Sequence, residues 1–216
     1  MELSATEVRI LGALVEKQAT TPDVYPLSLN ALTNACNQTT NRDPVMELTE
    51  DAIRWAVNNL RQQSMVRAIQ RADARVMKFE HLLREKLQVD GAELAMLCVL
   101  MLRGPQTTGE IKGRSGRLHE FASLAEVDET LRTLMTRSLV VEVPRRPGQK
   151  EARFAHTLSP VAETSASTTH DAPPVMIVER AGSDDDRIRA LESTVDQLKG
   201  ELAALQSAFD EFKRQF

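Results

Sequence analysis

The chain has 216 residues and a formal net charge of −4, so it is long enough for two small domains but not for several large ones. Its hydrophobic fraction of 42% is typical of a globular protein, and its aromatic fraction of 4% suits helical cores built from aliphatic side chains. No apolar run reaches the roughly 18 residues of a membrane span, and the first residues lack the basic start of a signal peptide. We therefore expect a cytoplasmic protein that keeps Cys36 and Cys98 as buried thiols.

Charge is spread unevenly along the chain. Residues 1–160 hold 21 of the 27 basic and 20 of the 31 acidic residues, and the remaining residues are strongly acidic. A strongly basic nucleic-acid-binding protein has a different balance. Any role of this kind therefore depends on local basic patches.

The first predicted elements run from the N-terminus to a helix that begins after Thr49. Ser4 with Glu7 forms a capping box, Ser28 caps a second helix, and Thr49 caps the third. Apolar residues recur at helical spacing after each cap. The third helix continues into a strand, and a second strand and a short helix follow. We predict helices over 4–17, 29–36, 49–64 and 81–87, and strands over 65–69 and 75–79.

The same order then appears a second time. Adding 74 to the numbers of the third helix leads from Thr49 to Ser123 and from Val66 to Val140. Asp90 and Thr107 begin two earlier helices with capping boxes of their own, and Gly104 with Pro105 ends the first of these. We predict helices from 90, from 107 to about 112 and from 123, and strands over 139–143 and 153–158.

Three helices followed by a two-stranded hairpin is the order of a winged helix-turn-helix domain. We therefore predict a mainly α fold with small β wings: two tandem winged helix-turn-helix domains over residues 1–88 and 89–158. A Ser-, Thr-, Ala- and Pro-rich segment over 159–186 has the composition of a flexible linker. The apolar run Val175–Val178 inside it could join a wing as an edge strand or stay disordered.

A C-terminal coiled-coil helix is predicted over 187–216. Apolar residues there recur at alternating spacings of three and four, which is typical of the seam of a coiled coil. The residue types favour a parallel coiled coil of two helices. We therefore expect a homodimer, the alternative being a helix that folds back on its own domains. The seam consists of Ile188, Leu191, Val195, Leu198, Leu202, Leu205, Phe209, Phe212 and Phe216.

Four long motifs lie in the first 160 residues: TTPDVYPLSLNALTNACNQTTNRDPVM (Thr20–Met46), MLRGPQTTGEI (Met101–Ile111), RLHEF (Arg117–Phe121) and PRRPGQKEARFAH (Pro144–His156). These motifs resemble the YceH family of bacterial cytoplasmic proteins of unknown function. The resemblance covers about residues 2–158 and implies a tandem winged-helix fold. It implies no catalytic site, cofactor or agreed partner.

The residues themselves predict no reaction centre. The four histidines have no second ligand at metal-binding spacing, and no phosphate-binding loop or nucleophile elbow is present. We therefore expect a non-enzymatic protein without a cofactor or a metal.

The third helices and the wings are the candidate contacts to double-stranded DNA. In a winged helix the third helix usually enters the major groove and the wing touches the backbone, and Arg and Asn suit base edges. Acids at the start of both third helices oppose this interpretation and favour the alternative, a scaffold that docks proteins. The predicted contacts are Arg54, Asn58 and Arg61 on the third helix, Arg71 and Arg75 on the first wing, and Arg145, Arg146 and Lys150 on the second.

The polar loop Asn37–Met46 precedes the first of these third helices. Side chains of its type commonly tie a loop to its own backbone, and this interpretation is favoured over a recognition surface beside Trp55. We expect Trp55, the only tryptophan of the chain, to be partly buried.

Overall fold

The computed structural model describes residues 2–70, 76–144 and 151–159. These residues form seven α-helices, one short 3-10 helix and two small antiparallel sheets, so the fold is mixed α/β with most of its ordered residues in helices. The predicted linker beyond Ser159, the run Val175–Val178 and the whole coiled-coil seam lie outside the described residues. So do five predicted DNA contacts, namely Arg71, Arg75, Arg145, Arg146 and Lys150. The homodimer stays a prediction.

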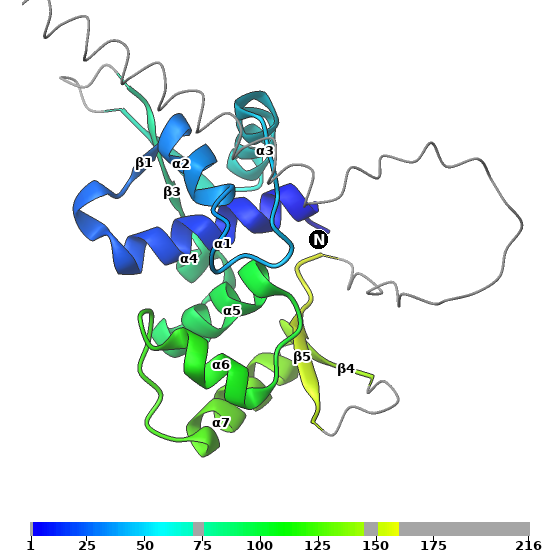
Figure 1. The fold of residues 1–216 in the computed structure, drawn as a ribbon. Coiled ribbons are helices and arrows are strands. Elements are labelled where there is room, and N and C mark those ends of the chain that lie inside the picture. Colours follow the sequence, from blue (N-terminus) through cyan, green and yellow to red (C-terminus); the bar gives the residue numbers. More distant parts are fainter. Residues whose placement is uncertain (1, 71–75, 145–150, 160–216) are drawn as a thin grey trace, which may run out of the picture. The chain divides into compact units, whose positions relative to one another are not determined.

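The first half of the described chain contains a three-helix unit and a small sheet (Figure 1). The sheet order is β1-β3-β2, with antiparallel neighbours. The elements are α1 (Ala5–Thr20), η1 (Pro22–Val24), β1 (Leu27–Ser28), α2 (Leu29–Cys36), α3 (Glu50–Gln62), β2 (Val66–Ile69), β3 (Lys78–His81) and α4 (Leu83–Leu87).

The second half repeats the order of three helices and a hairpin. Its two strands pair antiparallel, and Gln106 forms an isolated bridge with Phe154 in place of a third strand. The elements are α5 (Gly91–Arg103), α6 (Thr108–Ser115), α7 (Leu124–Thr136), β4 (Val140–Val143) and β5 (Arg153–His156).

Local capping explains where the six main helices begin. In every case the side chain of the residue before the helix accepts a hydrogen bond from a first-turn amide, which would otherwise have no partner. The predicted capping boxes at Ser4, Asp90 and Thr107 are confirmed. The caps are Ser4, Ser28, Thr49, Asp90, Thr107 and Ser123.

Several predicted boundaries are wrong, and tertiary pairing explains most of the differences. The first helix runs on to Thr20 before Pro22 stops it. The second strand lies at Lys78–His81 instead of 75–79, because its register with Val66–Ile69 buries Phe79 and His81 on one face. His81 therefore belongs to the strand and not to α4. The short strand β1 was not predicted, because its two residues form a strand only by pairing with β3.

The ends of the second half also differ from the prediction. Helix α6 continues to Ser115, which is completely buried, whereas a loop was expected from Gly113. Strand β5 ends at His156 and not at Leu158.

The same turn links α3 to β2 and α7 to β4. Ser64 and Ser138 lie 74 residues apart in the sequence and have positive φ angles of 57° and 55°. The amide of Met65 donates to the Leu60 carbonyl, and the amide of Leu139 donates to the Leu134 carbonyl, both at 2.9 Å. Val66 pairs with His81, and Val140 pairs with His156. The repetition seen in the sequence therefore extends to backbone hydrogen bonds.

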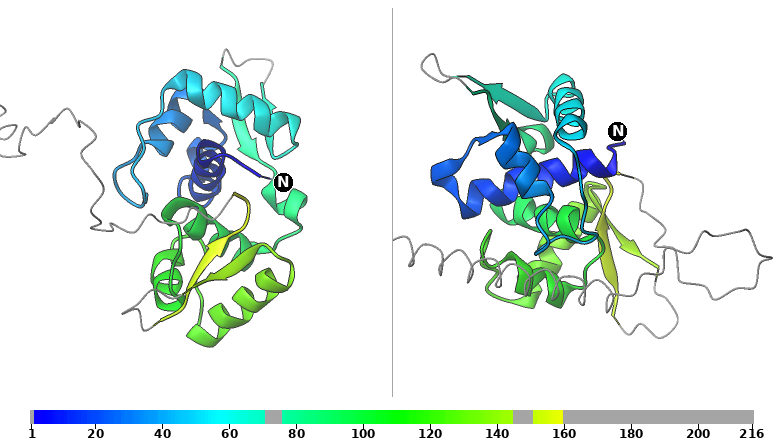
Figure 2. Two further views of the ribbon diagram at one scale, coloured as in Figure 1. Left: turned by 90° about the vertical axis from the view of Figure 1, so that its right-hand side faces the viewer. Right: turned by 45° about the horizontal axis from the view of Figure 1, so that its top comes forward.

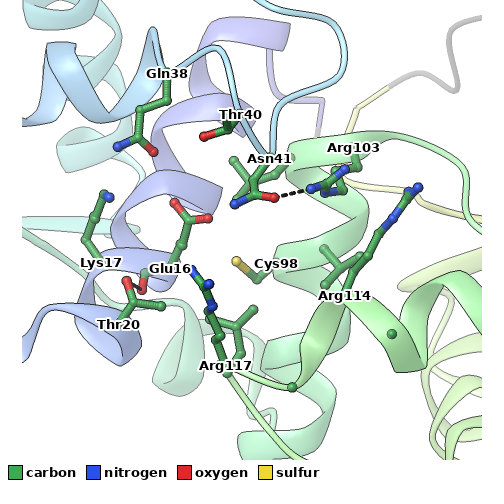
Figure 3. Close-up of a pocket in the computed structure, with 15 residues that line it drawn as sticks. Glu16, Lys17, Thr20, Gln38, Thr40, Asn41, Cys98, Arg103, Arg114 and Arg117 are labelled. Atoms are coloured by element: carbon green, nitrogen blue, oxygen red, sulfur yellow. Dashed lines mark hydrogen bonds between the residues drawn. The ribbon is translucent and has the colours of Figure 1, made fainter.

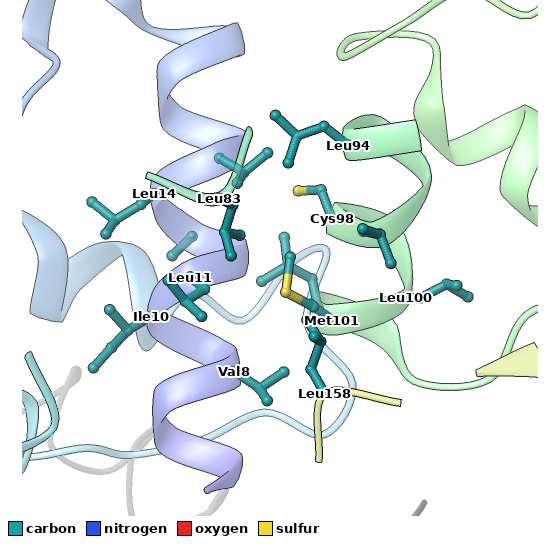
Figure 4. Packing of buried hydrophobic residues seen from close by; sticks show 14 of the residues in the cluster. Val8, Ile10, Leu11, Leu14, Leu83, Leu94, Cys98, Leu100, Met101 and Leu158 are labelled. Atoms are coloured by element: carbon teal, nitrogen blue, oxygen red, sulfur yellow. The ribbon is translucent and has the colours of Figure 1, made fainter. Parts of the chain in front are cut away.

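Helices α1 and α5 lie side by side where the two halves meet (Figures 2 and 4). Their apolar side chains belong to one continuous core. Gly12 permits the close approach, because a Cβ atom there would lie 2.8 Å from Leu102 Cδ2 and 3.2 Å from Met101 Cβ. The Sγ atom of Cys98 donates to the Gly12 carbonyl at 3.4 Å. Both cysteines are free and buried, as predicted.

Buried arginines hold the long loop between α2 and α3. Arg42 is fully buried and donates to both carboxylate oxygens of Glu16, at 3.2 and 2.6 Å, and to the Ala35 carbonyl. Arg9 donates to the carbonyls of Cys36 and Pro44. The predicted attachment of the loop to its own backbone is seen at Asn37, whose side chain donates to the Leu48 carbonyl and accepts from the Leu48 amide, both at 2.8 Å.

Candidate nucleic-acid interface

The outward face of α3 carries a row of exposed side chains, most of them polar. Ile53, Ala56, Val57 and Leu60 form the buried stripe of the helix. The residues between them face solvent because successive helical residues turn by about 100°. The exposed row consists of Asp51, Arg54, Trp55, Asn58, Arg61 and Gln62.

The prediction that Trp55 is partly buried is wrong. Its exposed fraction is 67%, the largest among the exposed large hydrophobic residues of the described chain. The buried stripe is complete without it, and the helical turn places it on the opposite side of α3. A large exposed aromatic ring on this face is suited to contact with a partner.

Arg54 is less available than the sequence indicated. Its guanidinium donates to Glu50 at 2.8 Å and to Asp51, so two acids of the first helical turn neutralise it. These acids also suit the positive end of the helix dipole. Arg54 is exposed enough to exchange partners, but in the free protein it adds no net positive charge to the face.

Asn58 and Arg61 lie together on the outward face of α3, in its C-terminal half. Arg61 Nη1 donates to Asn58 Oδ1 at 3.3 Å. Both residues line a shallow groove of about 620 Å³ between α3 and β2. Arg67 of β2 lines the same groove and pairs with Glu80 of β3. The other lining residues are Gln62, Ser64, Val66, Ala68 and Leu82.

The corresponding face of α7 has a different chemistry. The offset of 74 residues places Asp128 and Glu129 where α3 has Arg54 and Trp55. Arg132 replaces Asn58 on this face and is exposed.

Arg153 is a further basic residue of the second hairpin and lies on β5. In the structure it donates to the Pro105 carbonyl at 2.8 Å and pairs with Glu110 at 2.9 Å. It therefore holds β5 to the start of α6 and does not present a free charge.

Burial shifts the pKa values of two cysteines and two histidines of the described chain. Burial raises the pKa of Cys36 to about 12 and also raises that of Cys98, so both thiols stay protonated and unreactive near neutral pH. Burial lowers the pKa of His81 and of His156 to about 4. Within residues 2–70, 76–144 and 151–159, no group of three or more His, Cys, Asp or Glu residues is arranged to hold a metal ion.

Comparison with known proteins identifies the family. The sequence model described as "Protein of unknown function, DUF480" matches residues 3–149. The chain belongs to the DUF480 family. Its relatives carry the name UPF0502 protein, and the predicted membership of an uncharacterised bacterial family of the YceH type is confirmed.

Relatives in the DUF480 family match almost the whole chain. The UPF0502 protein of Herminiimonas arsenicoxydans is 48% identical over 97% of this chain and 88% of its own length. The UPF0502 protein of Pelobacter propionicus is 47% identical over 100% of this chain and 99% of its own. The corresponding protein of Shewanella amazonensis is 46% identical over 95% and 98%. Their names assign no activity.

One further property concerns membranes. None of the helices in the part of the chain that the structure describes has the length and the apolar composition needed to cross a lipid bilayer.

Proposed function

We propose that this DUF480 protein is a tandem winged-helix protein that binds double-stranded DNA through α3 and β2 of its first half. The observation that carries this proposal is the groove beside α3, where Asn58, Arg61 and Arg67 present hydrogen-bond donors from a helix and an adjoining hairpin. A helix and a wing on one side of a three-helix unit are the contact elements of winged-helix proteins.

The groove also predicts how binding depends on salt. Arg54 is neutralised by its own helix and Arg67 is paired with Glu80, so few cations on this face are free for phosphates. With about two or three phosphate contacts, the log–log dependence of affinity on salt has a slope of about −2 to −3. We therefore expect weak binding to arbitrary duplexes and a role that depends on base contacts from Asn58 and Arg61.

The test is a titration of the full chain with a fluorescent duplex at several salt concentrations. Trp55 provides a second signal, because it is the only tryptophan and lies on the proposed interface. Arg61→Ala is expected to weaken binding about fivefold, which is about 1 kcal/mol, and to reduce the salt slope. Arg132→Ala removes an exposed arginine from α7 and serves as the matched control, with unchanged affinity expected.

Two outcomes would contradict DNA binding through α3. One is the absence of any duplex binding at low salt. The other is an equal loss of affinity in Arg61→Ala and Arg132→Ala, since that result would reflect general charge and not a specific face.

A second candidate function is a protein-docking scaffold, and the exposure of Trp55 favours it. An aromatic ring with an exposed fraction of 67%, beside an acid-paired arginine, resembles the anchor of a protein interface more than a phosphate contact. Under this alternative, Trp55→Ala abolishes association with the partner while Arg61→Ala has little effect, and the association changes little with salt.

A further inference from the structure

A second cleft lies where the two halves meet, away from the α3 groove. It is bounded by the C-terminal part of α1, the loop after α2, and helices α5 and α6 (Figure 3). Its volume is about 560 Å³, which is within the range of pockets that hold small organic molecules. The cleft and the α3 groove share no lining residue.

The floor of this cleft is apolar and comes from α5. Cys98, Val99 and Leu102 line it, and all three are buried in the core that joins α1 to α5. The Cys98 thiol is protonated near neutral pH because burial raises its pKa. The floor therefore offers an uncharged surface against which a ring could pack.

The rim of the cleft is basic. Lys17 comes from α1, Arg103 from the end of α5, Arg114 from α6, and Arg117 from the segment after α6. Within the described residues, no carboxylate lies within 4.0 Å of Lys17, Arg103 or Arg117. Arg103 donates to the side chain of Asn41 instead.

Two carboxylates near the rim are already engaged. Glu16 lines the cleft, but both of its oxygens accept hydrogen bonds from the buried Arg42. Glu110 lies 3.5 Å from Arg114 and also pairs with Arg153 at 2.9 Å. The remaining polar residues of the lining, Thr20, Gln38, Thr40 and Asn41, carry no charge. Positive charge therefore exceeds negative charge around the opening.

Arg103 has both cations and acids nearby. Burial lowers the pKa of its guanidinium, the nearby Arg114 and Arg42 lower this pKa further, and Glu16 and Asp43 act in the opposite direction. Like charges that converge on one opening repel one another, and a bound anion would relieve that repulsion. Guanidinium groups are well suited to phosphate because they can donate two parallel hydrogen bonds to its oxygens.

We propose that this cleft binds a small phosphorylated ligand of nucleotide size, with its phosphates on Lys17, Arg103, Arg114 and Arg117 and its ring on the Cys98–Leu102 floor. Such a ligand would contact α1 from the first half and α5 and α6 from the second. Its binding therefore ties the two halves together and stabilises the folded chain.

A nucleotide-sized ligand fits these observations better than a nucleic-acid duplex does. The cations surround a hollow between two helical units and do not line the outward face of a recognition helix. The inference does not depend on DNA binding through α3, because the two sites are built from different residues.

The experiment uses the full chain and three probes: ATP, inorganic pyrophosphate and adenosine. Calorimetric titration and the thermal unfolding midpoint are measured for each probe. We expect ATP to bind and to raise the midpoint, pyrophosphate to bind more weakly because it lacks the ring, and adenosine not to bind because it lacks the phosphates.

The Lys17→Gln/Arg117→Gln variant removes two rim cations that have no ion pair within the described residues. It is expected to weaken ATP binding at least about tenfold, the effect of losing about 1.4 kcal/mol. The control, Lys86→Gln/Arg132→Gln, makes the same change in charge at exposed positions outside the cleft and is expected to keep the parent affinity. The single variant Arg117→Gln gives a second measurement if the double variant does not fold.

Three results would overturn the proposal. The first is the absence of ATP binding to the parent chain at low salt, and the second is the same ATP affinity in the rim variants as in the parent. The third is loss of duplex DNA binding in the rim variants when neither ATP nor pyrophosphate binds, which would assign the cleft to nucleic acid. Arg61→Ala separates the two proposals, because it should keep ATP binding even if α3 contacts DNA.

Discussion

The two halves of the described chain share a framework but differ in what they expose. Both have three capped helices, the same left-handed serine turn after the third helix, and a hairpin with a histidine at the corresponding position. The first half adds a long loop held by buried arginines and an exposed row on α3 that includes Trp55. On the second half, α7 has acids at the positions that correspond to Arg54 and Trp55.

The comparison separates the residues that build the fold from those that make a surface. Caps, apolar stripes and turns recur in both halves because each three-helix unit must satisfy its helix ends and bury one face. The outward residues of α3 and α7 neither cap a helix nor fill the core. The difference in their chemistry is therefore the better guide to function, and Arg54, Trp55 and Arg61 lie on α3.

The largest expected contrast concerns one ion pair in each half. Arg42 is fully buried against Glu16, which has an exposed side-chain fraction of 13%. Replacement of Arg42 by Ala leaves a carboxylate and a backbone carbonyl without donors, and should lower the free energy of unfolding by about 3–5 kcal/mol. Urea denaturation of the full chain measures this loss.

Arg114 in α6 provides the control for that experiment. Its side chain is 35% exposed, lies 3.5 Å from Glu110 and donates to the side chain of the buried Gln106, so Arg114→Ala should cost less than Arg42→Ala, about 1–2 kcal/mol. Equal losses in the two variants would show that Arg42 is not the buried anchor of the first half.

The second contrast tests whether α1 and α5 join the halves as closely as the structure shows. An alanine Cβ at Gly12 meets Leu102 Cδ2 at 2.8 Å, whereas one at Gly113 of α6 meets nothing within 4 Å. Both substitutions gain the same helix propensity, up to about 1 kcal/mol. Gly12→Ala should therefore be less stable than Gly113→Ala by about 1–3 kcal/mol, the cost of overpacking.

Thermal unfolding of the two glycine variants provides the measurement. If Gly12→Ala were as stable as Gly113→Ala, α1 and α5 would have room for a methyl group between them. That result would contradict the close packing of these two helices.

The smallest contrast concerns the two equivalent histidines. His81 Nε2 lies 2.7 Å from Gln18 Oε1, and His81 Nδ1 accepts the Leu83 amide at 3.3 Å, whereas His156 Nδ1 is buried without a hydrogen-bond partner among the described residues. At pH 7, His81→Phe should therefore cost about 1–2 kcal/mol. His156→Phe should be close to neutral.

Both histidines should also make stability depend on pH. Their pKa values fall from 6.5 to about 4 on folding, so between these values the unfolded chain binds more protons than the folded chain. The free energy of unfolding should fall as the pH is lowered through this window, by up to about 1.4 kcal/mol per pH unit for each histidine. Urea denaturation at several pH values measures this dependence, and each Phe variant should remove about half of it. An unchanged slope of unfolding free energy against pH would contradict the lowered pKa of the replaced histidine.

Much of the fold was predictable because its signals are local. A cap such as Ser28 or Thr107 and the stripe that follows it involve residues within a few positions of one another. The starts of the helices and the repeat offset follow from these signals. The strand positions were less accurate, because the register of β3 depends on its pairing with β2 and β1 and not on its own sequence.

The candidate α3 face was predicted in part. Asn58 and Arg61 lie on the expected side of the helix, but the neutralisation of Arg54 and the exposure of Trp55 differ from the sequence-based interpretation. The spacing of Arg54 from Glu50 already contained a signal, because residues four apart on a helix can form an ion pair. The exposure of Trp55 depended on which neighbours completed the buried stripe.

The sequence alone determined the order of the elements, the caps, the repeated third helix with its strand, and the membership of the DUF480 family. Tertiary structure alone decided that Arg42 is buried and that Lys17, Arg103, Arg114 and Arg117 surround one cleft. The physical reason is range. Hydrogen bonds at helix ends and apolar periodicity act between neighbours in the chain, whereas a cluster of charges from three separate segments exists only after α1 and α5 have packed together.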